Sequence, residues 1–255
     1  MRSWKLIGPL ILALAVTVCG QAQTPPKPAA ANAENKPPQF DLEQYQFALL
    51  KRGPQWTAEQ TPAVETLMAG HMANIQKMGR LGKLMAAGPF GKNDAGLAGI
   101  FIFKAASMDE AKALAAEDPA IKAGRLALDF FTWHGPKGLG AKFNEEYRKD
   151  PQTKVTMTKY YFGMLKKGDK WTAQASPEKQ QVQLGHLWHI RRMLDAKQYL
   201  TAGPFAGNNE VLGIVVIAAD TLDAAKAIAE ADPVVKAGQL RVEYVEWYVA
   251  KEVWP

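Results

Sequence analysis

The chain has 255 residues, of which 47% are hydrophobic and 22% are charged, a composition typical of a globular protein with one large domain or two small ones. The formal net charge is +6, but Lys and Arg are interspersed with Asp and Glu, which argues against a nucleic-acid-binding surface. Cys19 is the only cysteine, so we expect no disulfide to stabilise the fold.

The N-terminus has the pattern of a secretory signal peptide. Basic residues precede an apolar run at residues 6–18, which is too short to span a bilayer comfortably. Small residues suit cleavage after Ala22, so residues 1–22 are predicted to be the signal peptide. Lipid attachment at Cys19 is the alternative, which the bulk of Val18 disfavours. We therefore expect a secreted or periplasmic protein without a transmembrane anchor after cleavage.

Two copies of one residue pattern organise the rest of the chain. The histidine His71 recurs as His186, and the Asp118–Pro119 pair recurs as Asp232–Pro233. Other residues that match in the same order, first copy before second, are Phe47 and Phe162, Gly53 and Gly168, Trp56 and Trp171, Gly70 and Gly185, 87–90 and 202–205, Gly99 and Gly213, and Trp133 and Trp247. Matches in a constant order through both copies indicate a tandem duplication.

The repeat sets the predicted domain boundaries. Residues 23–40 are rich in Pro, Ala and Asn and have little to bury, so we expect a disordered linker. The first domain is predicted at 41–134 and the second at 158–255. The intervening residues 135–157 are Gly-rich and then charged, and have no partner in the repeat, so they are interpreted as a linker with one short helix.

Hydrophobic periodicity predicts the elements of the first copy in chain order. They are a strand at 45–50, a helix at 62–79, strands at 83–87 and 98–104, a helix at 108–116 and a strand at 125–133. Ser107 and Glu110 form the capping-box pattern of a helix start. The order β-α-β-β-α-β is that of a ferredoxin-like fold, with an antiparallel sheet and both helices on one face.

The predicted fold class is therefore α+β, with two tandem ferredoxin-like domains. The bare face of each sheet must be covered, so we expect the halves to pack sheet to sheet as an internal pseudo-dimer. Pairing between chains in a homo-oligomer is the alternative.

Two histidines and two aspartates are the candidate catalytic residues. His71 and His186 lie mid-helix with apolar residues one turn away on either side, so each imidazole is predicted to point toward the sheet. Asp118 and Asp232 follow the second helix of each copy. A carboxylate beside an imidazole fixes its tautomer and supports proton transfer near neutral pH. The alternatives are a core histidine bonded to a backbone carbonyl and an aspartate that only starts a turn.

Other recurring residues permit two interpretations. The Ala-Gly-Pro-Phe segments at 87–90 and 202–205 are predicted to enter or end a strand with a bend that Gly permits. They are interpreted as structural turns, or else as segments that expose N–H groups to an anionic substrate. Trp56, Trp171 and their counterparts near the ends of the closing strands, Trp133 and Trp247, are expected to pack in the core or an interface, or else to line a pocket.

The sequence does not favour a metal or cofactor. His189 follows His186 at a spacing that could share a metal, but the first copy has Asn74 at that place and no further ligand is close. The sequence has no Gly-rich phosphate loop, no Gly-x-Ser-x-Gly motif and no cysteine nucleophile. We therefore predict no cofactor and no metal site.

These motifs together resemble the YCII-related domain family. They are the helix histidine, the Ala-Gly-Pro turn, a helix with the Glu110-Ala111-Lys112 pattern, then Asp-Pro-x-x-Lys-Ala-Gly and a closing strand that ends in Trp. The resemblance covers residues 45–134 and 160–250 and implies a dimeric α/β-barrel fold. By similarity, the family's proposed active-site His and Asp fall on His71 with Asp118 and on His186 with Asp232. The wider superfamily includes isomerases, dehydrochlorinases of ring compounds and monooxygenases that need no metal.

The sequence thus supports two hypotheses. The first is a cofactor-independent lyase or isomerase-like enzyme whose His–Asp pairs act as general acid and base on a small acidic or ring substrate. The second is a non-catalytic periplasmic module that binds a small molecule or has a structural role.

Overall fold

The computed structural model describes residues 35–150, 155–207 and 209–255. The predicted signal peptide and most of the predicted linker at 23–40 lie outside the described residues. Within the described ranges, no helix is long and apolar enough to cross a membrane. The end of the predicted linker is placed against the second half, where Trp188 Nε1 donates a hydrogen bond of 3.0 Å to the Lys36 carbonyl oxygen.

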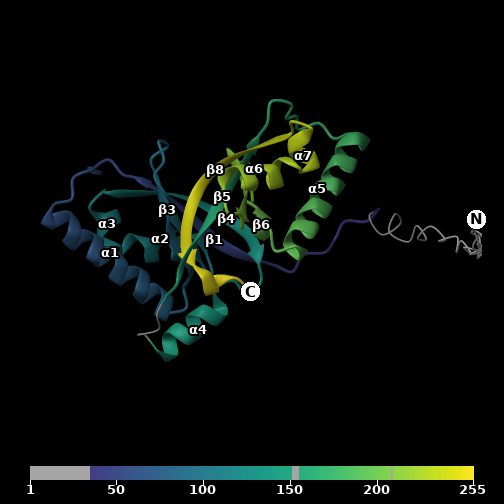
Figure 1. The fold of residues 1–255 in the computed structure, drawn as a ribbon. Coiled ribbons are helices and arrows are strands. Elements are labelled where there is room, and N and C mark those ends of the chain that lie inside the picture. The colour runs from purple at the N-terminus through teal and green to yellow at the C-terminus, as the bar shows by residue number, and fades with distance from the viewer. Residues whose placement is uncertain (1–34, 151–154, 208) are drawn as a thin grey trace, which may run out of the picture. The chain divides into compact units, whose positions relative to one another are not determined.

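Each half contains the predicted β-α-β-β-α-β order (Figure 1). The first half comprises β1 (Leu42–Arg52), α1 (Pro62–Arg80), β2 (Leu84–Pro89), β3 (Leu97–Phe103), α2 (Met108–Ala116), α3 (Pro119–Lys122) and β4 (Leu126–Pro136). The second half comprises β5 (Met157–Lys167), α5 (Pro177–Asp195), β6 (Tyr199–Pro204), β7 (Val211–Ile217), α6 (Leu222–Glu230), α7 (Pro233–Lys236) and β8 (Leu240–Ala250). The antiparallel sheets have the orders β2-β3-β1-β4 and β6-β7-β5-β8. The fold class predicted from the sequence is confirmed.

Helix starts follow the capping residues in the sequence. Thr61 caps α1 by accepting a hydrogen bond from the Val64 N–H, and Pro62 occupies the first turn, where a missing N–H is harmless. Ser107 caps α2 in the same way, through the N–H of Glu110. The short helices α3 and α7 were not predicted. They form because Asp118 and Asp232 act as N-caps immediately before proline.

The helices cover one face of each sheet. Met78 of α1 and Ala111 and Ala115 of α2 pack against Phe101 and Phe103 of β3. In the second half, Ala225 and Ala229 of α6 belong to the equivalent cluster on the sheet. Small alanines on α2 and α6 let these helices lie close to large strand residues.

The other face of each sheet packs against the sheet of the other half. One core cluster joins them, with Phe47, Leu49, Ile100 and Ile102 from the first sheet and Phe162, Met164, Ile214 and Val216 from the second. The rings of Phe47 and Phe162 stack with centroids 6.2 Å apart. The expected internal pseudo-dimer is therefore present within one chain.

Two seams close the sheets into a barrel. At the first seam β2 lies against β8, and at the second β4 lies against β6. Bridges between Phe90 and Trp247 and between Trp133 and Phe205 mark these seams. The edge strands of each sheet are thus covered by the opposite half, which removes exposed strand edges.

The Ala-Gly-Pro-Phe segments belong to the seams. Each segment lies at the end of an edge strand, β2 or β6. The Gly88 carbonyl oxygen accepts a hydrogen bond of 3.1 Å from Trp247 Nε1, and the Gly203 carbonyl accepts one of 3.1 Å from Trp133 Nε1. Glycine is required because the backbone of the other half passes where a side chain would stand. These segments therefore recur because they close the barrel.

A further helix, α4 (Ala141–Lys149), lies between the halves in sequence, where one short helix was expected. Its buried Asn144 donates a 2.9 Å hydrogen bond from Nδ2 to the Leu84 carbonyl oxygen at the start of β2. The Gly140 N–H donates a 2.7 Å bond to the carbonyl of Val253, in a short 3-10 helix at Lys251–Val253 near the C-terminus. The segment between the repeats is thus packed onto the first half.

Candidate functional site

The first His–Asp pair joins α1 to α3. His71 is buried on α1 and its ring stacks over Phe101 of β3, with centroids 5.9 Å apart, so it faces the sheet as predicted. Its Nδ1 lies 2.8 Å from Oδ2 of Asp118. The other carboxylate oxygen of Asp118 accepts a 2.9 Å hydrogen bond from the Ala120 N–H. Asn74 Nδ2 donates a longer bond of 3.3 Å to Oδ2.

The second pair repeats this geometry between α5 and α7. His186 Nδ1 lies 2.7 Å from Asp232 Oδ2, and Asp232 Oδ1 accepts a 3.0 Å bond from the Val234 N–H. The glycine before each histidine allows the two helices to approach. A Cβ at Gly185 would lie 3.1 Å from Cγ of Pro233, and the first half has the same close contact.

The environment of Asp118 determines the tautomer of His71. Burial acts to raise the pKa of Asp118, but the hydrogen bond and charge of His71, with smaller contributions from Ala120 and Asn74, outweigh it and hold the pKa below its ordinary value. The carboxylate is therefore ionised at neutral pH and accepts the hydrogen carried on Nδ1 of His71. In neutral His71 the opposite ring nitrogen, Nε2, is then an unprotonated base.

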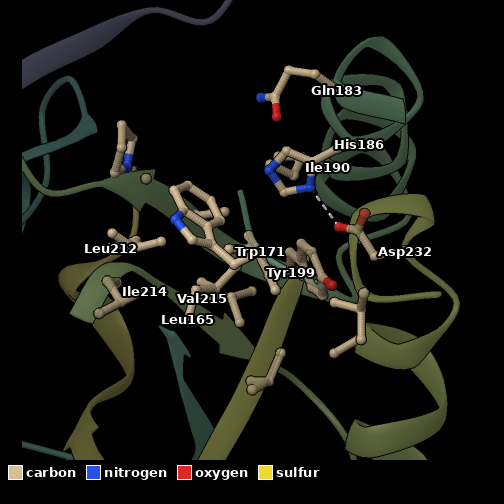
Figure 2. A pocket seen from close by; sticks show the side chains of 18 residues that line it. Leu165, Trp171, Gln183, His186, Ile190, Tyr199, Leu212, Ile214, Val215 and Asp232 are labelled. Atoms are coloured by element: carbon tan, nitrogen blue, oxygen red, sulfur yellow. Dashed lines mark hydrogen bonds and ion pairs between the residues drawn. The ribbon is translucent and has the colours of Figure 1, made fainter. Parts of the chain in front are cut away.

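The second pair borders a cavity of about 300 Å³ between α5 and the sheet. Figure 2 shows the His186 ring with one nitrogen toward Asp232 and the other facing the cavity, with Gln183 above it and Trp171 across from it. The remaining wall is largely apolar, including Leu165, Ile190, Leu212 and Ile214. A few polar groups in an apolar cavity of this size are typical of a small-molecule site.

The first pair borders a separate cavity of about 600 Å³. It occupies the equivalent place, between α1 and the first sheet, and extends under α4, where Phe143, Asn144 and Tyr147 line it. His71 lies in its wall, and the fully buried Asp118 lies behind His71. The structure thus brings together each predicted His and Asp, but places the two pairs in different cavities.

His189 faces away from a shared site with His186. Its Nε2 lies 3.3 Å from the Tyr199 hydroxyl in the core of the second half. Burial lowers the pKa of His189, opposed by the charge of Asp232 and assisted by Arg192 and His186. Among the residues placed by the structure, no group of three or more His, Cys, Asp or Glu side chains is arranged to hold a metal ion.

The tryptophans divide between the two expected roles. Trp133 and Trp247 are fully buried at the seams. Trp171 is 41% exposed and lines the second cavity. Trp56, its counterpart, instead packs under the guanidinium of Arg52, 4.2 Å from the ring centroid.

Sequence reasoning missed two contributors to the cavities. Gln183 lies one turn before His186 on the same helix face, so its spacing was an available signal. The cover formed by α4 had no such signal, because the segment has no counterpart in the repeat.

Comparison with known proteins supports this architecture. The family model of the YCII-related domain matches residues 47–129 and 161–248. No curated protein matches the chain. Three solved forms of chlorite dismutase from Candidatus Nitrospira defluvii are similar in structure. Two forms with a substituted arginine have TM-scores of 0.53, identities of 12% and 14%, and coverage of 87% of this chain and 95% of theirs. A tryptophan-substituted form in complex with cyanide has a TM-score of 0.53 and 13% identity, and the match covers 84% of this chain and 92% of that one. At these identities the likeness concerns the fold.

Proposed function

Because the chain belongs to the YCII-related domain family, of which it carries two copies, we propose that it is an exported enzyme with two general acid–base sites. His71 with Asp118 forms one site and His186 with Asp232 forms the other. The reaction is of the lyase or isomerase type, requires no cofactor, and acts on a small acidic or ring substrate.

One observation carries this proposal. In each half a buried aspartate holds Nδ1 of a histidine at hydrogen-bond distance, and the histidine lines a cavity. Nε2 then takes a proton from a substrate C–H bond, and the carboxylate stabilises the imidazolium that forms. Returning the proton to a different substrate atom completes an isomerisation. Delivering it to a departing group completes an elimination.

Export is proposed from the basic N-terminus and the apolar run at residues 6–18. Mass spectrometry of the protein from its native host should find a mature N-terminus after Ala22. An intact N-terminus in the cytoplasmic fraction would contradict export.

A second function is favoured by the contacts of the aspartates. Asp118 and Asp232 each cap a short helix while holding a histidine, and Gly70 lies against Pro119. In a non-catalytic binding or structural module, the His–Asp hydrogen bonds would serve only to hold the long helix to the short one, as a clasp between helices. That function predicts that breaking the His–Asp pairs lowers the melting temperature, and that the wild-type protein has no turnover.

The double variant His71→Gln and His186→Gln separates the two functions. A glutamine amide can donate to the aspartate but cannot take a proton near neutral pH, so the clasp survives and the base does not. NMR product detection on a panel of small acids and ring compounds should show turnover by the wild type and none by the double variant, with similar melting temperatures.

His134→Gln is the matched control, because His134 lies on β4 and lines neither cavity. Its turnover should equal that of the wild type. Full turnover by the double variant would refute the acid–base assignment. A wild type that converts nothing in the panel, with an Asp118→Ala and Asp232→Ala double variant that melts at a lower temperature, would support the module.

A further inference from the structure

The described part of the first cavity's wall is uncharged. Among the described residues that line it there is no Lys, Arg, Asp or Glu. His71, Gln76, Asn144 and Tyr147 are the polar side chains there, and the Asn144 amide is already bonded to the Leu84 carbonyl. An anionic or cationic ligand would lose its hydration without gaining an opposite fixed charge, which is costly in an apolar site.

Two substitutions between the halves explain why this cavity is the larger. Gly79 and Leu84 line the first cavity, and the repeat places Leu194 and Tyr199 at the same positions in the second half. The absence of a side chain at Gly79 leaves room beneath α4, since a Cβ there would meet only Asn144 Oδ1, at 3.8 Å. In the second half, Leu194 and Tyr199 pack in the core cluster beside the sheet.

The wall of the first cavity also includes exposed apolar side chains. Met72, Val155 and Met157 are 51%, 37% and 49% exposed, and all three line the cavity. Methionine adapts its shape to an apolar partner at little cost. Exposed apolar residues gathered at one cavity indicate a surface that an apolar ligand covers.

We propose that the first cavity binds an uncharged, largely apolar molecule of drug-like size, with a polar atom of that molecule placed at Nε2 of His71. The second cavity, at half the volume and with Gln183 beside His186, selects a smaller and more polar ligand. This deepens the proposed function, on which it rests for the role of His71, by assigning different substrate classes to the two sites.

Two fluorescent probes with the same ring system test the charge selectivity. N-phenyl-1-naphthylamine is uncharged, and 8-anilinonaphthalene-1-sulfonate adds one sulfonate. The wild-type protein should bind the uncharged probe at least tenfold more tightly, with one high-affinity site per chain. Equal affinity for both probes, or no saturable binding of the uncharged one, would overturn the inference.

Variants that import residues of the second half locate the binding site. Gly79→Leu fills the space beneath α4, and Met68→Gln places the counterpart of Gln183 in the wall. Each should weaken binding of the uncharged probe at least fivefold. Ala73→Leu is the matched control, because it adds similar bulk to the exposed side of α1 and should leave the affinity unchanged. Unchanged binding by both folded cavity variants would overturn the site assignment.

This test is independent of turnover. The His71→Gln and His186→Gln double variant should retain binding of the uncharged probe within a few fold, because the apolar wall is intact. Loss of turnover with equal binding of the two probes would reject only the ligand class. Selective probe binding with full turnover in the double variant would reject only the acid–base chemistry. A dimer in light scattering that excludes the probe would show that a second copy covers the cavity, and would also reject the ligand class.

Discussion

A single methyl group at Gly88 should open the first seam of the barrel. A Cβ at this position would lie 1.9 Å from the Tyr248 carbonyl oxygen and 2.8 Å from Nε1 of Trp247. Reaching ordinary van der Waals contact requires β2 and β8 to separate by roughly 1.5 Å. That movement breaks the 3.1 Å hydrogen bond from Trp247 Nε1 to the Gly88 carbonyl.

The expected cost follows from these two effects. Overpacking a well-packed region costs about 1–3 kcal/mol. A buried donor and acceptor left without partners add about 1–3 kcal/mol. Gly88→Ala should therefore lower the free energy of unfolding by about 2–6 kcal/mol, a large part of the roughly 5–15 kcal/mol typical of a folded protein.

Urea unfolding followed by tryptophan fluorescence measures this cost, because Trp247 is fully buried at the seam. Gly203→Ala should show the same loss at the second seam, where the Cβ would lie 1.9 Å from the His134 carbonyl oxygen. Gly79→Ala is the control, since it meets only an ordinary contact and should stabilise the last turn of α1 by up to about 1 kcal/mol. A Gly88→Ala protein as stable as the wild type would refute the close approach of β2 and β8.

Three further outcomes concern the second-half core, the first site and α4. Burial lowers the pKa of His189 in the folded state, so below about pH 6.5 the unfolded state binds a proton that the folded state does not. The free energy of unfolding of the wild type should therefore fall as the pH falls from there. His189→Asn should flatten this dependence in urea unfolding, and an unchanged slope would contradict it. Asp118→Ala should lower the free energy of unfolding by roughly 3 kcal/mol at pH 7. In urea unfolding, this difference from the wild type should shrink as the pH falls below about 3.9 through the lowered pKa of Asp118. A difference that stays constant would argue against an ionised Asp118. Asn144→Ala removes the donor to Leu84 and should speed amide exchange in α4 at least tenfold, whereas wild-type exchange would show that the bond does not hold the helix.

The sequence predicted the fold because its signals were local and duplicated. Strands and helices were recognised from hydrophobic periodicity, and Ser107 marked the start of α2. The order of elements then required a cover for each sheet, and the repeat supplied one. The family resemblance and the repeated order of elements therefore pointed to the same barrel.

The sequence could not reveal long-range contacts. Gly88 appeared to be a turn residue because its neighbour across the seam, Tyr248, is far away in the chain. The pairing of His71 with Asp118 was a hypothesis until the packing of α1 against α3 gave the distance. The difference between the two cavities depends on α4 as well as on the two differences between the repeats, and α4 has no repeated counterpart to compare.

The presence of both halves in one chain has an evolutionary consequence. In a dimer of identical subunits every mutation changes both sites at once, so the sites cannot diverge. Fusion into one chain ends this constraint, because a change at Gly79 leaves Leu194 untouched. One half can then remain unchanged while the other diverges. The joined halves also remain together at any dilution, so the protein keeps its barrel where a dissociable pair would separate.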